Sequence, residues 1–139
     1  MDINLSTQAE VNDFQATYGS GWICNRVTGK LTVSGDGVTD VGGLSNIVSI
    51  GILVIKNNND LTNIDGLSSV SRVEGYASIY GNAVLADIDG LANLTSIAGN
   101  LHIGTNNSLL DIIANCWRNG ADHVYRRSFL SAIFTPGCL

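Results

Sequence analysis

Hydrophobic residues recur along the middle of the chain with a nearly fixed period. The Gly-Leu pairs that begin at Gly43, Gly66 and Gly90 lie 23 and 24 residues apart. An earlier, less regular unit begins near Leu31. The apolar columns that keep step with these pairs are Ile47/Val70/Leu94, Ile50/Val73/Ile97, Leu53/Ala77/Leu101, Ile55/Ile79/Ile103, Leu61/Leu85/Leu109 and Ile64/Ile88/Ile112. A period of about 20 to 50 residues is typical of repeat proteins, in which each unit shields the apolar side chains of the next.

Within each unit, the pattern predicts a short strand followed by tight bends. Leu53 and Ile55 alternate with Val54, so the two apolar side chains are expected to point inward and Val54 outward. Apolar residues spaced by three elsewhere predict bends and short extended or helical pieces. The glycines at the start of the three pairs are expected at corners that need a positive φ or a close backbone approach. The pattern therefore predicts a solenoid of about four coils.

Three asparagines, Asn58, Asn82 and Asn106, also recur at intervals of 24 residues. Each follows the predicted strand by three residues. An Asn in a bend can bond the backbone of its own turn and of the next, so we interpret this column as structural. The alternative is a row of ligand-binding amides.

The repeat resembles a known family of extracellular domains. The segments Gly-Leu-Ser-Asn-Ile-Val-Ser-Ile-Gly (43–51) and Gly-Leu-Ala-Asn-Leu-Thr-Ser-Ile-Ala-Gly-Asn-Leu-His-Ile (90–103) are similar to the repeat of receptor L domains. This resemblance covers about residues 28–112. It implies a mainly β, right-handed parallel β-helix or leucine-rich-repeat-like solenoid. It also implies an extracellular or cell-surface binding or adhesion module without catalysis, and it identifies no ligand.

The two ends of the chain are expected to cap the repeats with helices, all within one structural domain. Residues 1–27 form the predicted N-terminal cap, where Thr7 and Glu10 have capping-box spacing ahead of a helix ending near Gly19. Residues 28–112 form the repeats, and 113–139 the C-terminal helical cap. A disulfide between Cys116 and Cys138 is the preferred pairing in an oxidising compartment, and the state of Cys24 stays open.

Composition narrows the possible partners and locations. The formal net charge is −5 and only 14% of residues are charged, which argues against nucleic acid as a partner. The longest strictly apolar run, 52–55, is far too short for a membrane span. No signal peptide is recognisable at the start of the chain. The expected location is secreted, periplasmic or cell surface, and a cytoplasmic protein is the alternative.

The outward side of the predicted strands is the candidate binding surface. An exterior face is normally polar, yet apolar or aromatic residues lie on neighbouring units here, and such groups often mark recognition surfaces. Its predicted ligand-binding residues are Ile52, Val54, Tyr76, Tyr80 and His102. The patch measures about 14 by 10 Å, which suits a glycan, a short peptide or part of a protein contact. Packing of this face against a cap or a second copy of the chain is an equal alternative.

Catalysis is not expected, and no cofactor or metal site is predicted. The sequence has no nucleophile elbow, no phosphate loop with a Lys and no His-Glu-x-x-His helix. The remaining enzymatic alternative is a polysaccharide-active enzyme, because Asp87 and Asp111 share one repeat column and Asp65 and Asp89 share another. These columns lie at corners, where Asp also forms Asx turns. The other alternative to a binding module is a self-associating unit of a surface fibre.

Overall fold

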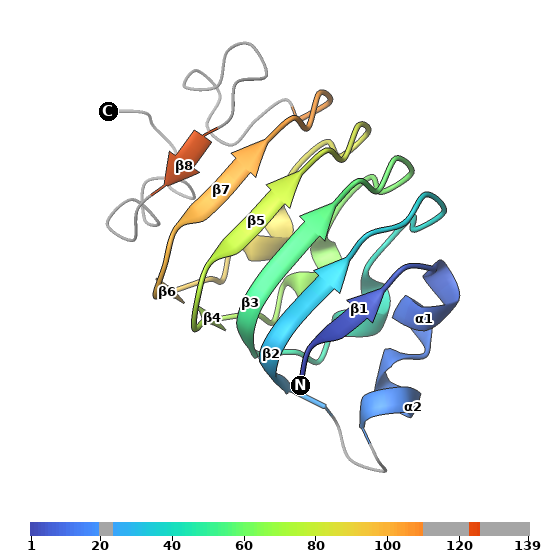
Figure 1. The fold of residues 1–139 in the computed structure, drawn as a ribbon, viewed down its shortest axis with the longest axis vertical. Coiled ribbons are helices and arrows are strands. Elements are labelled where there is room, and N and C mark those ends of the chain that lie inside the picture. Colours follow the sequence, from blue (N-terminus) through green and yellow to red (C-terminus); the bar gives the residue numbers. More distant parts are fainter. Residues whose placement is uncertain (20–23, 110–122, 126–139) are drawn as a thin grey trace.

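The computed structural model describes residues 1–19, 24–109 and the backbone of 123–125. These residues form one mostly parallel sheet with the strand order β1-β2-β3-β5-β7-β8, seen face-on in Figure 1. The six strands of this path are β1 (Ile3–Leu5), β2 (Arg26–Val33), β3 (Ser49–Lys56), β5 (Ala77–Tyr80), β7 (Leu101–Gly104) and β8 (His123–Tyr125). Only β8 pairs antiparallel, with β7. The two-residue strands β4 (Arg72–Val73) and β6 (Ser96–Ile97) continue the sheet beside the start of β3.

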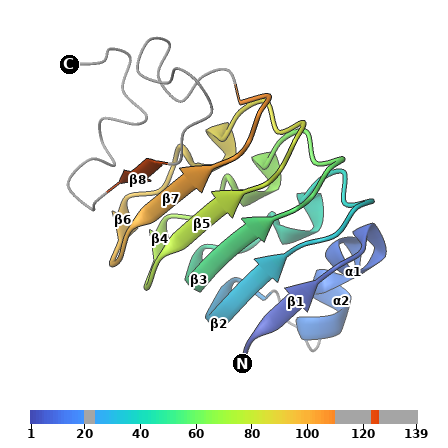
Figure 2. The ribbon, with the colours of Figure 1, turned by 45° about the horizontal axis from the view of Figure 1, so that its top comes forward.

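The register of the sheet follows the sequence period. Leu53 pairs with Ala77, and Ala77 pairs with Leu101, so equivalent residues of successive repeats lie side by side. Their side chains belong to one continuous apolar cluster on a single face of the sheet. The 3-10 helices η1 (Gly42–Leu44), η2 (Asp65–Leu67) and η3 (Asp89–Leu91) cover that face, each with a fully buried leucine (Figure 2). The predicted strand positions and apolar columns are thus confirmed wherever the chain is described.

The predicted fold class, a right-handed parallel β-helix or leucine-rich-repeat-like solenoid with helical caps, is wrong. The described chain is one mostly parallel sheet with two short α-helices of five residues each. Its returning segments are turns and 3-10 helices, and β4 and β6 join the same sheet instead of building another wall. The described residues do not form the helical caps that were predicted at the two ends. Within the predicted C-terminal helical cap, 113–139, the described residues 123–125 form a strand.

The N-terminal segment differs from the single helix that the sequence predicted. Residues 3–5 form β1, which pairs in parallel with β2. Two helices follow, α1 (Gln8–Asn12) and α2 (Phe14–Tyr18), separated at Asp13. They bury Val11 and Phe14 against the core. The predicted capping box is confirmed, because the Thr7 side chain accepts a hydrogen bond from the Glu10 N–H and the Glu10 carboxylate accepts one from the Thr7 N–H.

This capping box predicts a pH effect on stability in acid. The Ser6 N–H and hydroxyl, at 2.6 and 3.0 Å, and then the Thr7 N–H hold the pKa of Glu10 below its ordinary value of 4.5. A depressed pKa in the folded state means that the carboxylate stabilises the fold above the unfolded pKa, and that this contribution disappears as the pH falls through the folded value. We expect Glu10→Gln to remove this part of the pH dependence in urea unfolding measured between about pH 6 and pH 2. An unchanged pH profile would contradict the role of the carboxylate.

The asparagine column forms a buried ladder, as the structural interpretation predicted. Asn58, Asn82 and Asn106 are almost completely buried. The Oδ1 atom of Asn82 accepts hydrogen bonds from the N–H and the Nδ2 of Asn58, at 3.1 and 2.9 Å, and its Nδ2 donates to the Ile55 carbonyl at 3.2 Å. Asn106 repeats this pattern one unit further, with Nδ2 donating to the Ile79 carbonyl. These side chains pair backbone groups that the bends after the strands would leave unsatisfied.

Several predictions fall on residues outside the described ranges. The disulfide partners Cys116 and Cys138 lie there, as do Asp111 and most of the predicted C-terminal cap. Cys24 is described, half-buried and in the thiol form, with its backbone N–H bonded to the side chain of Gln15.

Candidate functional site

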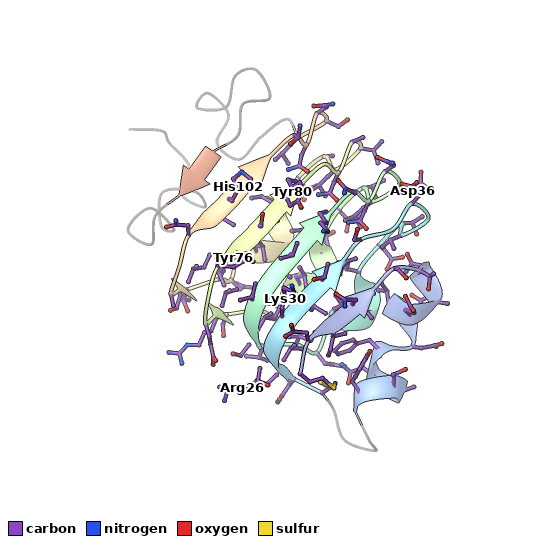
Figure 3. The ribbon with its side chains drawn as sticks, viewed as in Figure 1. Arg26, Lys30, Asp36, Tyr76, Tyr80 and His102 are labelled. Carbon is purple, nitrogen blue, oxygen red and sulfur yellow. The ribbon has the colours of Figure 1, made fainter. Side chains whose placement is uncertain are left out.

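The outward face of the sheet lies opposite the apolar core and carries the predicted ligand-binding residues. Tyr76 is 45% exposed, whereas Ile52, Tyr80 and His102 are half-buried. Val54, at the centre of the face, is only 9% exposed. Figure 3 shows Tyr76, Tyr80 and His102 on this face. The structure therefore brings the predicted residues onto one surface, although Val54 offers little area to a ligand.

Tyr80, Ser78 and His102 form a small cluster at one end of the outward face. The Ser78 hydroxyl lies 3.2 Å from Nδ1 of His102, and the Tyr80 and His102 rings are 6.2 Å apart between centroids. Among the described residues, no carboxylate contacts the His102 ring. Ser78 is 9% exposed. A shielded hydroxyl beside an unsupported imidazole lacks the orienting third group of a nucleophilic site, so the contact is better suited to fixing the His102 ring.

At the other end of the face, a one-residue difference between repeats produces a groove. Strand β2 places three residues between Val27 and Leu31, whereas β3 places two between their partners Ile50 and Leu53. The next repeat again has three residues at this point. The strand with one residue fewer leaves the surface lower there than on either side. The resulting open groove of about 410 Å³ is lined by Asp2, Thr28, Gly29, Lys30, Gly51, Ile52, Glu74, Gly75 and Tyr76.

The middle of this groove is lined by glycines, because a side chain at Gly51 or Gly75 would overlap the preceding repeat. A Cβ on Gly51 would overlap the carbonyl groups of Thr28 and Gly29, and one on Gly75 would come within 2.8 Å of the Ile52 side chain. The groove is therefore lined by backbone between two walls of side chains. This close approach lets the backbones of neighbouring repeats pack directly against each other.

The walls of the groove combine an aromatic ring with charged groups. Tyr76 contributes the aromatic ring and Lys30 an ammonium group. The carboxylate of Asp2 accepts a hydrogen bond from the backbone N–H of Lys30 at 2.9 Å. The carboxylate of Glu74 forms an ion pair with Arg26 at 2.7 Å. Both members of this ion pair are substantially exposed, so it adds little stability. Such a surface can offer stacking, an ammonium donor and carboxylate acceptors to a polar ligand.

Ile52 and Tyr76 were predicted from the sequence, but the groove that they line was not. Asp2 and Glu74 were missed because one precedes the first strand and the other lies at a bend. One signal could have revealed the groove. The first two Gly-Leu pairs are 23 residues apart and the next two are 24 apart, and this missing residue lies between Ile50 and Leu53.

At the corners, the side chains of Asn63 and Asp87 bond the backbone. Oδ1 of Asp87 accepts a hydrogen bond from the Asp89 N–H at 3.1 Å, and Oδ1 of Asn63 accepts one from the Asp65 N–H at the same distance. These are Asx turns, in which one carboxylate oxygen of Asp87 is committed to the backbone, whereas Asp65 and Asp89 take part through their backbone N–H groups. Within the described ranges, no group of three or more His, Cys, Asp or Glu side chains is placed to hold a metal ion.

No helix in the described part of the chain has the length and apolar character needed to cross a membrane. Comparison of the chain with protein-family models, curated proteins and solved structures found no match of any of the three kinds.

Proposed function

We propose that this protein is a non-enzymatic binding or adhesion module whose ligand lies across the outward face of the parallel sheet. The observation that carries the proposal is the groove beside Tyr76. The register places a tyrosine that is 45% exposed next to a glycine-lined depression, on the face of the sheet opposite the core. Aromatic side chains that stay exposed beside a depression are typical of recognition sites.

The proposed location is secreted, periplasmic or cell surface, following the resemblance of the repeats to receptor L domains. The absence of catalysis is part of the proposal. It is supported by the use of Asp87 in a turn and by the lack of a supporting group for His102 among the described residues.

Replacing Tyr76 by alanine tests this function. We expect at least tenfold weaker binding of a ligand found by screening glycans and short peptides, because stacking and desolvation of the ring are lost. The free energy of unfolding should change by less than about 0.5 kcal/mol, since the residue is at the surface. Titration calorimetry and urea unfolding of the same samples measure the two effects.

Val48→Ala is the matched control, because Val48 is 43% exposed and lies outside the groove. It should leave affinity unchanged. Light scattering across a hundredfold concentration range, with wild type and Tyr80→Glu, distinguishes a binding face from an assembly face. A wild-type dimer that Tyr80→Glu dissociates would overturn the proposal in favour of self-association.

A further inference from the structure

The charges of this acidic chain are unevenly distributed. The chain has 12 acidic and 7 basic residues, and its only two lysines are Lys30 and Lys56. Both lie at outward positions, Lys30 paired with Ile52 and Lys56 paired with Tyr80. The other residues that continue this face, in these strands or directly before or after them, carry no carboxylate, and they are Thr32, Ser34, Ile52, Val54, Tyr76, Ser78, Tyr80, Asn100, His102 and Gly104. The carboxylates of Asp2 and Glu74 border the face at the groove.

Neither lysine is neutralised within the described residues. The one ion pair found there joins Arg26 and Glu74, so both ammonium groups lie more than 4.0 Å from any described carboxylate oxygen. Of the carboxylates near the groove, Glu74 is held by Arg26 and Asp2 is bonded to the Lys30 backbone. Acidic residues such as Asp36 lie in the loops beyond the ends of the strands (Figure 3). The backbone hydrogen bond leaves the charge of Asp2 in place, so Lys30, Lys56 and Arg26 stand against Asp2 and Glu74 on this face. The outward face therefore has a small excess of positive charge on an otherwise anionic protein.

Each lysine shares its part of the face with an aromatic residue. Lys56 and Tyr80 are register partners on adjacent strands. Lys30 and Tyr76 lie on opposite sides of Ile52 in the groove. The two lysines are four positions apart along the strands and one strand apart across the sheet, which corresponds to roughly 14 Å. Two lysines whose backbones lie at this separation, together with two tyrosines on the same face, match a ligand with repeated anionic groups and flat apolar surfaces between them.

We infer that the ligand of this face is an acidic oligosaccharide, bound through Lys30 and Lys56 at its anionic groups and through Tyr76 and Tyr80 at its sugar rings. This inference rests on the proposed function and specifies its ligand. The anionic groups are carboxylates, as in a uronic-acid polymer, or sulfates. The hydroxyls of Thr32 and Ser34, which follow Lys30 at outward positions, supply hydrogen bonds for ring hydroxyls near the charges.

An oligosaccharide matches this surface better than an acidic peptide. The backbone N–H and C=O groups of a sheet lie in its plane and pair with neighbouring strands, so the face offers few main-chain partners to a peptide. The amides of a peptide laid flat on the face would lose water without replacement, at about 1–3 kcal/mol for each unsatisfied group. A folded protein partner needs about 800 Å² on each side, well above the area of this patch.

The test compares four probes by titration calorimetry: oligogalacturonate, a heparin-derived oligosaccharide, the methyl ester of the oligogalacturonate and a glutamate peptide of similar charge. We expect at least one acidic oligosaccharide to bind tenfold or more tightly than the uncharged ester and the peptide. Comparison of the first two probes distinguishes carboxylate from sulfate. Affinity should fall as salt rises from about 0.05 to about 0.5 M, because salt screens charges at the surface.

Variants then assign the charges. Lys30→Met and Lys56→Met are each expected to weaken binding of the acidic probe about tenfold, whereas the arginine replacements retain most of the affinity because they keep the charge. Arg72→Met is the matched control, since Arg72 is exposed on β4 away from both lysines. Equal loss in Arg72→Met would mean that net charge alone drives binding, and it would overturn the assignment.

The remaining outcomes separate this inference from the proposed function. If the methyl ester binds as tightly as the acid and Tyr76→Ala weakens both, the ligand is a neutral sugar and the inference fails while the binding function stands. Tighter binding of the glutamate peptide overturns the inference in the same way. If none of the four probes binds, the inference fails. A wider glycan and peptide screen without any ligand would overturn the proposed function as well.

Discussion

Replacing Gly66 by alanine is expected to destabilise the protein by about 3 kcal/mol or more, a large effect for the addition of one methyl group. Gly66 lies in η2, directly against the backbone of the preceding repeat. A Cβ there would overlap the carbonyl group of Val41. Because both groups belong to backbone that is held in register, neither can rotate away, and the two repeats must separate.

The sign of this effect distinguishes packing from conformational preference. Gly66 does not have a positive φ, since Gly37 and Gly81 are the described glycines that do. Alanine would therefore stabilise the turn by about 0.5–1 kcal/mol if backbone entropy alone mattered. The free-energy cost of the overlap with Val41 exceeds that gain, so the free energy of unfolding should fall. Urea unfolding followed by circular dichroism measures it.

Gly42→Ala is the matched control in the preceding repeat. An added Cβ there would come within 3.1 Å only of the Asp40 carboxylate oxygen, the end of a flexible side chain. Its stability should stay within about 1 kcal/mol of wild type. Equal stability of the Gly66 and Gly42 variants would show that the repeats separate without penalty, contrary to the close packing described here.

Replacing Asn82 by alanine is expected to destabilise the protein by about 3–5 kcal/mol, because several buried polar groups lose their partners together. The N–H and Nδ2 of Asn58 lose their shared acceptor, and the Ile55 carbonyl loses a donor. Each unsatisfied buried group contributes about 1–3 kcal/mol. The exposed Asn93, which donates one hydrogen bond to the Ser68 carbonyl, is the matched control. Asn93→Ala should change stability by about 1 kcal/mol or less.

Asn82→Asp tests the donor role of the amide without changing its shape. At neutral pH the new carboxylate would face the Ile55 carbonyl and Oδ1 of Asn106, where the amide of wild type donates. Burial and these oxygens should raise its pKa in the folded state. The neutral acid is then the stable form, so the deficit relative to wild type should shrink below about pH 4 and grow as the pH rises through the folded pKa. A deficit independent of pH between about pH 4 and pH 8 would argue against a donor role.

The interior of the molecule could largely be predicted from residue types and spacing. Alternation of Leu53 and Ile55 with Val54 predicts a strand whatever its neighbours are, because side-chain direction alternates along any extended chain. The asparagine column was interpretable for a similar reason, since Asn bonds its own backbone locally. The capping box of Thr7 and Glu10 needs only residues three apart.

The fold class could not be predicted in the same way. A fixed period shows that units repeat, but it does not show which segments of each unit pair with the next unit. Here Arg72–Val73 and Ser96–Ile97 joined the main sheet, and the segments around Gly66 and Gly90 became 3-10 helices, so the walls of a β-helix did not form. The N-terminal helix was also interrupted, at Asp13.

The sequence by itself determined which residues are buried, which asparagines hold the bends and which side chains share the outward face, since these depend on period and local hydrogen bonding. Only the tertiary structure decided that one missing residue in β3 opens a groove beside Tyr76, and that Asp2 and Glu74 border it. A depression depends on the difference between neighbouring strands, and charges distant in sequence meet only when those strands are in register.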